Sequence, residues 1–216
     1  MRRILVLIGV AAVVAGGAMT VPAVAGAATT TCTSTLAPGT YGTVVVPAGA
    51  VCIIDHGPLT ITGGLVVGAG ATFVFGSEET PDVTATIYEG VHATNAASVQ
   101  IHFATIYEGV FITGGAGPFG GPFDVTWTTI EDSLINGPVT IQGYNGFWSG
   151  FIRNTVFGTV TYRNNTVADP DGNEVVTNTI HGNLVCSGNT PPPQVGDSEG
   201  SPNTVTGRRS GQCALL

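Results

Sequence analysis

The heptapeptide Ala-Thr-Ile-Tyr-Glu-Gly-Val occupies residues 85–91 and returns unchanged at residues 104–110. A second motif, Asn-Thr-Val-Phe-Gly at residues 154–158, returns as Asn-Thr-Ile-His-Gly at 178–182 and as Asn-Thr-Val-Thr-Gly at 203–207. The offsets between copies are 19, 24 and 25 residues. Self-similarity at this spacing indicates a solenoid, in which each repeat forms one coil that stacks on the next.

Three columns of mostly aliphatic residues accompany these motifs. The columns stand two residues before, two residues after and four residues after the last residue of each repeated five-residue motif. Polar or small residues alternate with them, which is the pattern of β-strands. The columns contain Ile61, Ile87, Ile106, Ile135, Val156, Ile180 and Val205; Val44, Leu65, Val91, Val110, Val139, Val160 and Leu184; and Val46, Val67, Ala93, Ile112, Ile141, Tyr162 and Cys186. A unit of about 22 residues holds two or three short strands with their corners and no crossover helix.

We therefore predict an all-β fold: a single-stranded, right-handed parallel β-helix, or β-solenoid, of about seven to eight coils with the columns stacked inside. The recurrent glycine that ends each pentapeptide, as at Gly158 and Gly182, predicts corners with positive φ. Four residues earlier, Asn154, Asn178 and Asn203 predict a ladder of stacked amides. Ordinary turn asparagines are the alternative for these three positions.

The first residues have the layout of a secretory signal peptide. Arg2 and Arg3 precede an apolar run over residues 4–14 and a stretch of small residues. We predict a signal peptide over residues 1–25, with cleavage after Ala27 or Ala28 as alternatives, and one β-helix domain over residues 26–216. The protein is then expected to be secreted, extracellular or cell-wall-associated, and an uncleaved membrane anchor is the alternative interpretation. No later apolar stretch is long enough to span a bilayer.

The predicted domain is acidic and contains no lysine. Four arginines stand against fourteen aspartates and glutamates, so its formal charge is −10. Nucleic acid and anionic membrane surfaces both require a cationic footprint, so this composition argues against them as partners. An acidic surface of this kind tolerates Ca²⁺.

Four cysteines lie in two groups, Cys32 and Cys52 near the start and Cys186 and Cys213 near the end. In an exported protein disulfides are the default, and three pairings can be drawn. We prefer Cys32–Cys52 and Cys186–Cys213, each of which would fasten one end of the array. A zinc site is the alternative, but the cysteines lack the closely spaced pair that such sites use.

Several motifs carry a resemblance to a known group of proteins. They are Pro-Gly-Thr-Tyr at residues 38–41, Val-Pro-Ala-Gly-Ala-Val-Cys at 46–52, the stretch at 178–189, and the ending at 203–207 and 211–213. The chain resembles secreted bacterial right-handed parallel β-helix proteins, in an uncharacterised group loosely of the pectate-lyase-like superfamily. The resemblance implies the fold and no particular activity.

Enzymes of that superfamily depolymerise acidic polysaccharides, and their motifs are missing from this chain. The polygalacturonase-like motifs are reduced to Ile180-His181-Gly182, a fragment of Gly-His-Gly. The lyase-like members use clustered aspartates for Ca²⁺ and an arginine or lysine as base, for which only Arg153 and Arg163 are candidates.

The candidate ligand site is centred on the two copies of the heptapeptide. Glu89 and Glu108 occupy equivalent corners of adjacent coils, so we expect their carboxylates to lie about 5 Å apart, where they can bind a cation or share a proton. The predicted ligand-binding residues are Tyr88, Tyr107, Glu89, Glu108, Trp127 and Glu131, and the weak catalytic candidates are Glu89, Glu108, His92 and His102. The alternative is that a duplicated coil copied its surface residues without a function.

Residues 169–173 offer a weak Ca²⁺ site. Asp169, Asp171 and Asn173 have the alternate spacing of oxygen ligands in a calcium loop. An ordinary Pro-Asp-Gly turn explains the same segment. No other cofactor is expected.

The predicted function is that of a secreted or cell-surface β-helix protein that is structural, adhesive or glycan-binding. Its expected partner is an extracellular or cell-wall polysaccharide. The alternative is a divergent polysaccharide lyase or glycoside hydrolase that acts on acidic polysaccharide. Because no complete catalytic motif is present, the sequence leaves enzymatic activity undecided and favours a protein without one.

Overall fold

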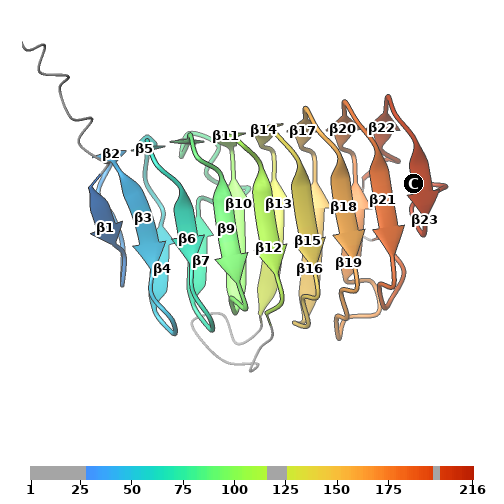
Figure 1. The fold of residues 1–216 in the computed structure, drawn as a ribbon, viewed down its shortest axis with the longest axis horizontal. Helices are drawn as coiled ribbons and strands as arrows, with labels where there is room; N and C mark the ends of the chain where they lie inside the picture. Colours follow the sequence, from blue (N-terminus) through green and yellow to red (C-terminus); the bar gives the residue numbers. More distant parts are fainter. Residues whose placement is uncertain (1–27, 116–125, 197–199) are drawn as a thin grey trace, which may run out of the picture.

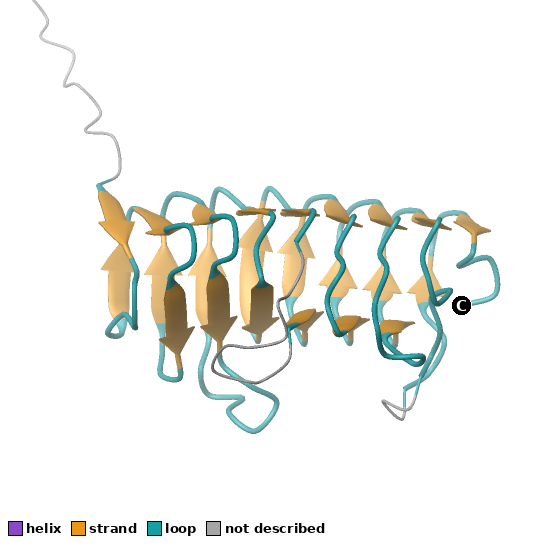
Figure 2. Cartoon of the chain, turned by 90° about the horizontal axis from the view of Figure 1, so that it is seen from below, coloured by secondary structure: helices purple, strands orange, loops and turns teal. Residues whose placement is uncertain are grey.

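The computed structural model describes residues 28–115, 126–196 and 200–216. The predicted signal peptide over residues 1–25 therefore lies outside the described residues. Every regular element in the described ranges is a β-strand (Figures 1 and 2). Within these ranges, no helix has the length and apolar character needed to cross a bilayer.

The strands form three sheets, and all strand pairs within them are parallel. Sheet A contains β1 (Thr29–Thr31), β3 (Thr43–Val46), β6 (Leu65–Val67), β9 (Val91–Thr94), β12 (Val110–Thr113), β15 (Val139–Gln142), β18 (Val160–Arg163), β21 (Leu184–Ser187) and β23 (Arg209–Gly211). Sheet B contains β2 (Gly39–Tyr41), β5 (Leu59–Ile61), β8 (Ala85–Ile87), β11 (Ala104–Tyr107), β14 (Leu134–Asn136), β17 (Thr155–Val156), β20 (Thr179–Ile180) and β22 (Thr204–Val205). Sheet C contains β4 (Val51–Ile54), β7 (Thr72–Phe75), β10 (Ser98–His102), β13 (Trp127–Glu131), β16 (Trp148–Ile152) and β19 (Asn173–Val176).

The order of the strands within each sheet is the order of a parallel β-solenoid. The chain visits the sheets in turn, and each sheet adds its strands in chain order along the long axis, from blue to red in Figure 1. In sheet B, Ile135 pairs with Val156 and Val156 pairs with Ile180, as the repeat predicts. Nearly every member of the three predicted columns is buried, with Val205 at the end only partly so. The prediction of an all-β, parallel solenoid is confirmed.

Single residues with left-handed backbone turn the chain from sheet C into sheet B. They are Phe103, Asp132, Arg153 and Thr177, with φ between 51° and 58°. After Arg153 and Thr177 comes a buried asparagine. The corners from sheet A to sheet C use Asn95 and Asn164 with φ of 53° and 55° in the same way, beside glycines in the other coils.

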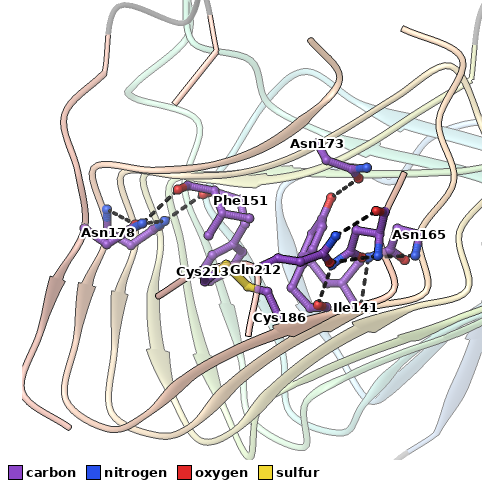
Figure 3. Close-up of a disulfide and its surroundings, with 12 residues drawn as sticks. Ile141, Phe151, Asn165, Asn173, Asn178, Cys186, Gln212 and Cys213 are labelled. Carbon is purple, nitrogen blue, oxygen red and sulfur yellow. Dashed lines mark hydrogen bonds between the residues drawn. A yellow bond between two sulfur atoms is a disulfide. The ribbon is translucent and has the colours of Figure 1, made fainter. Parts of the chain in front are cut away.

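Two amide ladders run along the inside of these corners. In the predicted ladder, Asn154 Nδ2 donates to Asn178 Oδ1 at 3.1 Å, and Asn178 Nδ2 donates to Asn203 Oδ1 at 2.8 Å. The second ladder was not predicted: it joins Asn165, Asn189 and Gln212 through bonds of 3.1 and 3.0 Å (Figure 3). Both ladders satisfy buried backbone groups, since the side-chain amides of these asparagines also donate to carbonyl oxygens of the preceding coil.

The glycines that end the repeated motifs are needed for a different reason from the predicted one. Gly158, Gly182 and Gly207 do not have positive φ. A Cβ on Gly182 would instead collide with the carbonyl oxygen of Gly158 in the coil below, and a Cβ on Gly207 would collide with that of Gly182. The stacked backbones approach too closely for a side chain. Glu108, which stands in its coil where Gly158 and Gly182 stand in theirs, has a left-handed φ of 64°.

Both predicted disulfides are present. Cys32 and Cys52 join with a Cα–Cα distance of 5.6 Å, and Cys186 and Cys213 join with one of 5.3 Å. The first ties the segment after β1 to β4, and the second ties β21 to the chain after β23 (Figure 3). Each bridge therefore fastens one end of the array.

The lengths of the connections differ between the corners. The connections from sheet B to sheet A contain one to three residues. The longer ones lie beside sheet C, at residues 76–84, 143–147 and 164–172. Residues 188–196 also reach this sheet, because Gln194 forms a bridge with Glu174 of β19. The insertions thus build up the surroundings of sheet C.

Candidate binding cleft

An open cleft of about 630 Å³ lies over the outer face of sheet C. Strands β10, β13, β16 and β19 supply its floor. The floor residues include Gln100, His102, Trp127, Thr129, Glu131, Trp148, Ile152 and Glu174. Residues from the flanking connections, among them Glu78, Glu79 and Asp169, form its walls.

Strand alternation determines which side chains reach the cleft. In β10, Val99 and Ile101 are fully buried core residues, so the residues between and after them, Gln100 and His102, point to the outer face. The parallel register then carries this face from strand to strand. Gln100 pairs with Thr129, His102 with Glu131, and Trp127 with Trp148.

Trp127 and Trp148 form an edge-to-face aromatic pair at one end of the cleft. Their ring centroids are 6.2 Å apart and their planes meet at 61°. The side chain of Trp127 is 41% exposed, which is high for a tryptophan on a folded chain. Trp148 Nε1 donates to Glu174 Oε1 at 3.1 Å, and Gln100 Nε2 donates to Ser98 Oγ at 3.1 Å. An apolar surface therefore lies beside carboxylate and amide groups.

At the other end, one arginine bridges three carboxylates. Arg153 Nε and Nη2 donate to the two oxygens of Asp132 at 2.7 and 2.8 Å. Arg153 Nη2 also donates to Glu131 Oε2 at 2.8 Å and contacts Glu78 Oε1. These contacts, first of all those with Asp132, raise the pKa of the Arg153 guanidinium, so it stays charged.

The left-handed corner brings Glu131 and Asp132 to the same side. In a regular strand two consecutive residues point to opposite faces. Asp132 has a φ of 51°, and its carboxylate lies beside that of Glu131, with both accepting hydrogen bonds from Arg153. The same corner one coil later places Arg153, with a φ of 55°, over Asp132.

Burial shifts the protonation of the groups in this cluster. Removal from water raises the pKa of Glu131 to about 7, assisted by the neighbouring Glu78 carboxyl and opposed by a hydrogen bond of 2.6 Å from Thr129 Oγ1. Glu78 lies closer to water, and its contacts with Glu131 and Arg153 lower its pKa. Burial lowers the pKa of His102, which favours the neutral imidazole.

His102 has an unusual environment. Its side chain and that of Glu131 are each only 7% exposed. His102 Nδ1 is buried and has no hydrogen-bond partner among the described residues, and the nearest Glu131 oxygen, Oε2, is 3.9 Å away. That distance is too long for a hydrogen bond.

The structure brings together only part of the ligand site that the sequence predicted. His102, Trp127 and Glu131 line the cleft. The other five residues lie on other sheets or at their corners. Tyr88 and Tyr107 stack at 5.3 Å beside sheet B, Glu89 and Glu108 stand exposed at the corners that lead to sheet A, and His92 of β9 stacks on Phe111 at 5.1 Å.

The predicted calcium ligands face different directions. Asp169 lines the cleft and accepts a hydrogen bond of 3.0 Å from the backbone N–H of Asp171 within a turn. Asn173 is buried, and its Oδ1 accepts a hydrogen bond of 2.9 Å from the hydroxyl of Tyr162 inside the solenoid. The oxygen of Asn173 therefore does not lie with the two carboxylates.

Sequence reasoning missed Glu78, Gln100, Asp132, Trp148 and Glu174, and it named Arg153 only as a candidate lyase base, apart from the ligand site. One signal was present for Trp148: it follows Trp127 by 21 residues, the same offset that separates Ile135 from Val156. Extending the register of the columns outside the repeated motifs would have paired the two tryptophans. Neither a family model, nor a curated protein, nor a solved structure matches this chain.

Proposed function

We propose that this chain is a secreted, right-handed parallel β-helix of about seven to eight coils that binds an uncharged polysaccharide in the cleft over sheet C, without turnover. The observation that carries the proposal is the pairing of Trp127 with Trp148 on adjacent strands, beside hydrogen-bonding side chains. Sugar rings have apolar faces that pack on aromatic rings and hydroxyl edges that bond to carboxylates and amides. The exposed ring of Trp127, next to Trp148, and the polar side chains around the pair offer both kinds of contact.

The charge of the cleft favours an uncharged ligand. Its lining contains five carboxylates, from Glu78, Glu79, Glu131, Asp169 and Glu174, against the single guanidinium of Arg153. A polymer of acidic sugars would meet like charge along this surface. This argument favours a neutral polysaccharide over the acidic one that the resemblance implied.

Secretion is supported by the two disulfides, since such bonds persist in oxidising compartments. With the sequence pattern at the start of the chain, they favour a protein that works outside the cell. Outside the cell, the protein can meet a polysaccharide both in the medium and in the cell wall.

The test is affinity electrophoresis of the purified protein in gels that contain neutral or acidic polysaccharides. We expect retardation by at least one neutral polymer, and Trp127→Ala should weaken it about 10-fold, because truncation of an aromatic anchor costs more than about 1 kcal/mol. Trp127 is partly exposed, so the variant is expected to fold. The matched control is Tyr88→Ala, which removes an exposed ring of the stack beside sheet B.

Each other outcome points to a different interpretation. Loss of binding in Tyr88→Ala and not in Trp127→Ala would move the ligand to the tyrosine stack. Release of oligosaccharides would favour the lyase or hydrolase alternative. Absence of retardation by every polymer would leave a structural role and overturn the proposal.

A further inference from the structure

We propose that His102, Glu131 and Asp132 bind one divalent transition-metal ion at the end of the cleft. The proposal is separate from polysaccharide binding, because it concerns the opposite end of the cleft from the tryptophans and is tested without a glycan. It rests on the positions of the ligand atoms, on an unpartnered buried nitrogen and on the balance of charge.

The ligand atoms are close enough to share one ion. One nitrogen of His102 and one carboxylate oxygen from each of Glu131 and Asp132 all lie within 4.8 Å of one another. His102 Nδ1 and Glu131 Oε2 are 3.9 Å apart. Two metal–ligand bonds of ~2.0–2.2 Å span atoms up to about 4 Å apart, so an ion fits between these two atoms where a hydrogen bond does not.

His102 Nδ1 is a buried nitrogen without a hydrogen-bond partner among the described residues, and this supports the site independently of the distances. A buried imidazole nitrogen almost always has a hydrogen-bond partner, because burial without one costs free energy. His102 Nδ1 has none among the described residues, although its side chain is only 7% exposed. Its nearest acidic neighbour is Glu131, so the free nitrogen faces the carboxylates. A metal ion would give this nitrogen its missing partner.

The charges of the cluster also call for a second cation. Arg153 is paired with Glu78, Glu131 and Asp132, so when all three carboxylates are ionised they exceed the one guanidinium by two negative charges. A divalent ion would balance that excess. Arg153 holds the carboxylates in place, and it also competes with the ion for their oxygens.

The donor set selects the kind of metal. An imidazole nitrogen together with carboxylate oxygens suits Zn²⁺ and related first-row ions, whereas Ca²⁺ and Mg²⁺ prefer oxygen ligands alone. The site therefore differs in both position and metal from the calcium turn that the sequence predicted at Asp169, Asp171 and Asn173.

The test is isothermal titration of the untagged, EDTA-treated protein with ZnCl₂, and with CaCl₂ for comparison. We expect one Zn²⁺ per chain and no saturable Ca²⁺ binding at the same concentrations. His102→Gln and Asp132→Asn should each weaken Zn²⁺ binding ~10-fold or more, since each removes or weakens one ligand. X-ray absorption spectroscopy of the Zn²⁺-loaded protein should show the outer-shell scattering of one imidazole ring, and this signal should be lost in His102→Gln.

The control is Glu108→Gln, which changes an exposed carboxylate that lies outside the cluster. It should leave the Zn²⁺ affinity within about twofold. His102 is buried, so circular dichroism must first show that His102→Gln keeps its strand signal. If that variant does not fold, the test relies on Asp132→Asn, which lies at a half-buried corner. Absence of stoichiometric Zn²⁺ binding, or affinity unchanged in Asp132→Asn, would overturn the metal site whether or not a polysaccharide binds.

Discussion

Asn178 holds Asn154 of the preceding coil through two bonds to a single atom. Asn178 Oδ1 accepts the backbone N–H of Asn154 at 2.9 Å and its side-chain Nδ2 at 3.1 Å. The amide nitrogen of Asn178 donates in turn to Phe151 O at 2.7 Å and to Asn203 Oδ1 at 2.8 Å. One buried side chain therefore joins three coils.

Replacement of this amide should be costly. We expect Asn178→Ala to lower the free energy of unfolding by about 3 kcal/mol, because it leaves several buried donors and acceptors without partners. Urea unfolding followed by circular dichroism measures the change. Asn136→Ala is the matched control on the outer side of sheet B, and it should change stability by less than about 0.5 kcal/mol. Equal effects of the two variants would show that the ladder contributes little.

The aliphatic columns should not tolerate a charge. Val160 is fully buried and pairs with Val139 and Leu184. Val160→Asp would place a carboxylate without a partner inside the solenoid, and we expect it to cost more than about 4 kcal/mol and to abolish the folded signal. The neighbouring Thr161→Asp, on the outer face of the same strand, should fold. Size-exclusion chromatography and thermal melting distinguish the two, and a normal melting temperature for Val160→Asp would contradict the register.

The disulfides should stabilise the two ends of the array more than its middle. Cys32–Cys52 closes a loop of 20 residues and Cys186–Cys213 one of 27. Their removal costs about 3 kcal/mol each in a chain-entropy model. After reduction, hydrogen exchange should accelerate in β1, β3, β21 and β23 and change little in β12 and β15, because the stability of a repeat array is local. Uniform acceleration along the chain would mean that the array unfolds as one unit.

The close contact at Gly182 should be sensitive to a single methyl group. A Cβ there would run into the Gly158 carbonyl, and both atoms belong to stacked backbones that cannot move apart without breaking pairs. We expect Gly182→Ala to lower the free energy of unfolding by about 2–3 kcal/mol. Gly49→Ala is the control: it has a φ of 70° and no atom within 4 Å of the added Cβ, so only backbone strain of about 1 kcal/mol applies. Urea titration of both variants checks the difference.

Sheets A and B could be predicted from the sequence because their strands carry the repeated motifs. The spacing of Ile135, Val156 and Ile180 fixes both the register and the buried face of sheet B. Sheet C carries no repeated motif of its own. Its paired core residues Ile101, Ile130, Phe151 and Val175 nevertheless each stand five residues before a column residue of sheet B, so the register could have been extended to them. The left-handed corners at Asp132 and Arg153 were missed for another reason, since only glycine signals such a backbone clearly.

The candidate site could be predicted only in part for the same reasons. Trp127, His102 and Glu131 were chosen for their chemistry, and the structure places them in one cleft. They were grouped with Glu89 and Glu108, because all lie in successive coils. A coil has three faces, however, and the repeated motifs of sheets A and B do not by themselves assign these residues to different ones. Arg153 and Asp132 become neighbours only through the corner geometry.

The connections from sheet B to sheet A are short and nearly equal in length, whereas those beside sheet C are longer and differ from coil to coil. The interior, with its columns and ladders, does not depend on how long the segments around sheet C are. Mutations that lengthen, shorten or change the residues of those segments are therefore expected to accumulate without loss of folding, as surface loops in general tolerate insertions and substitutions. Divergence among copies of such a protein would be concentrated around the cleft, and new ligand specificities could be selected there on an unchanged framework.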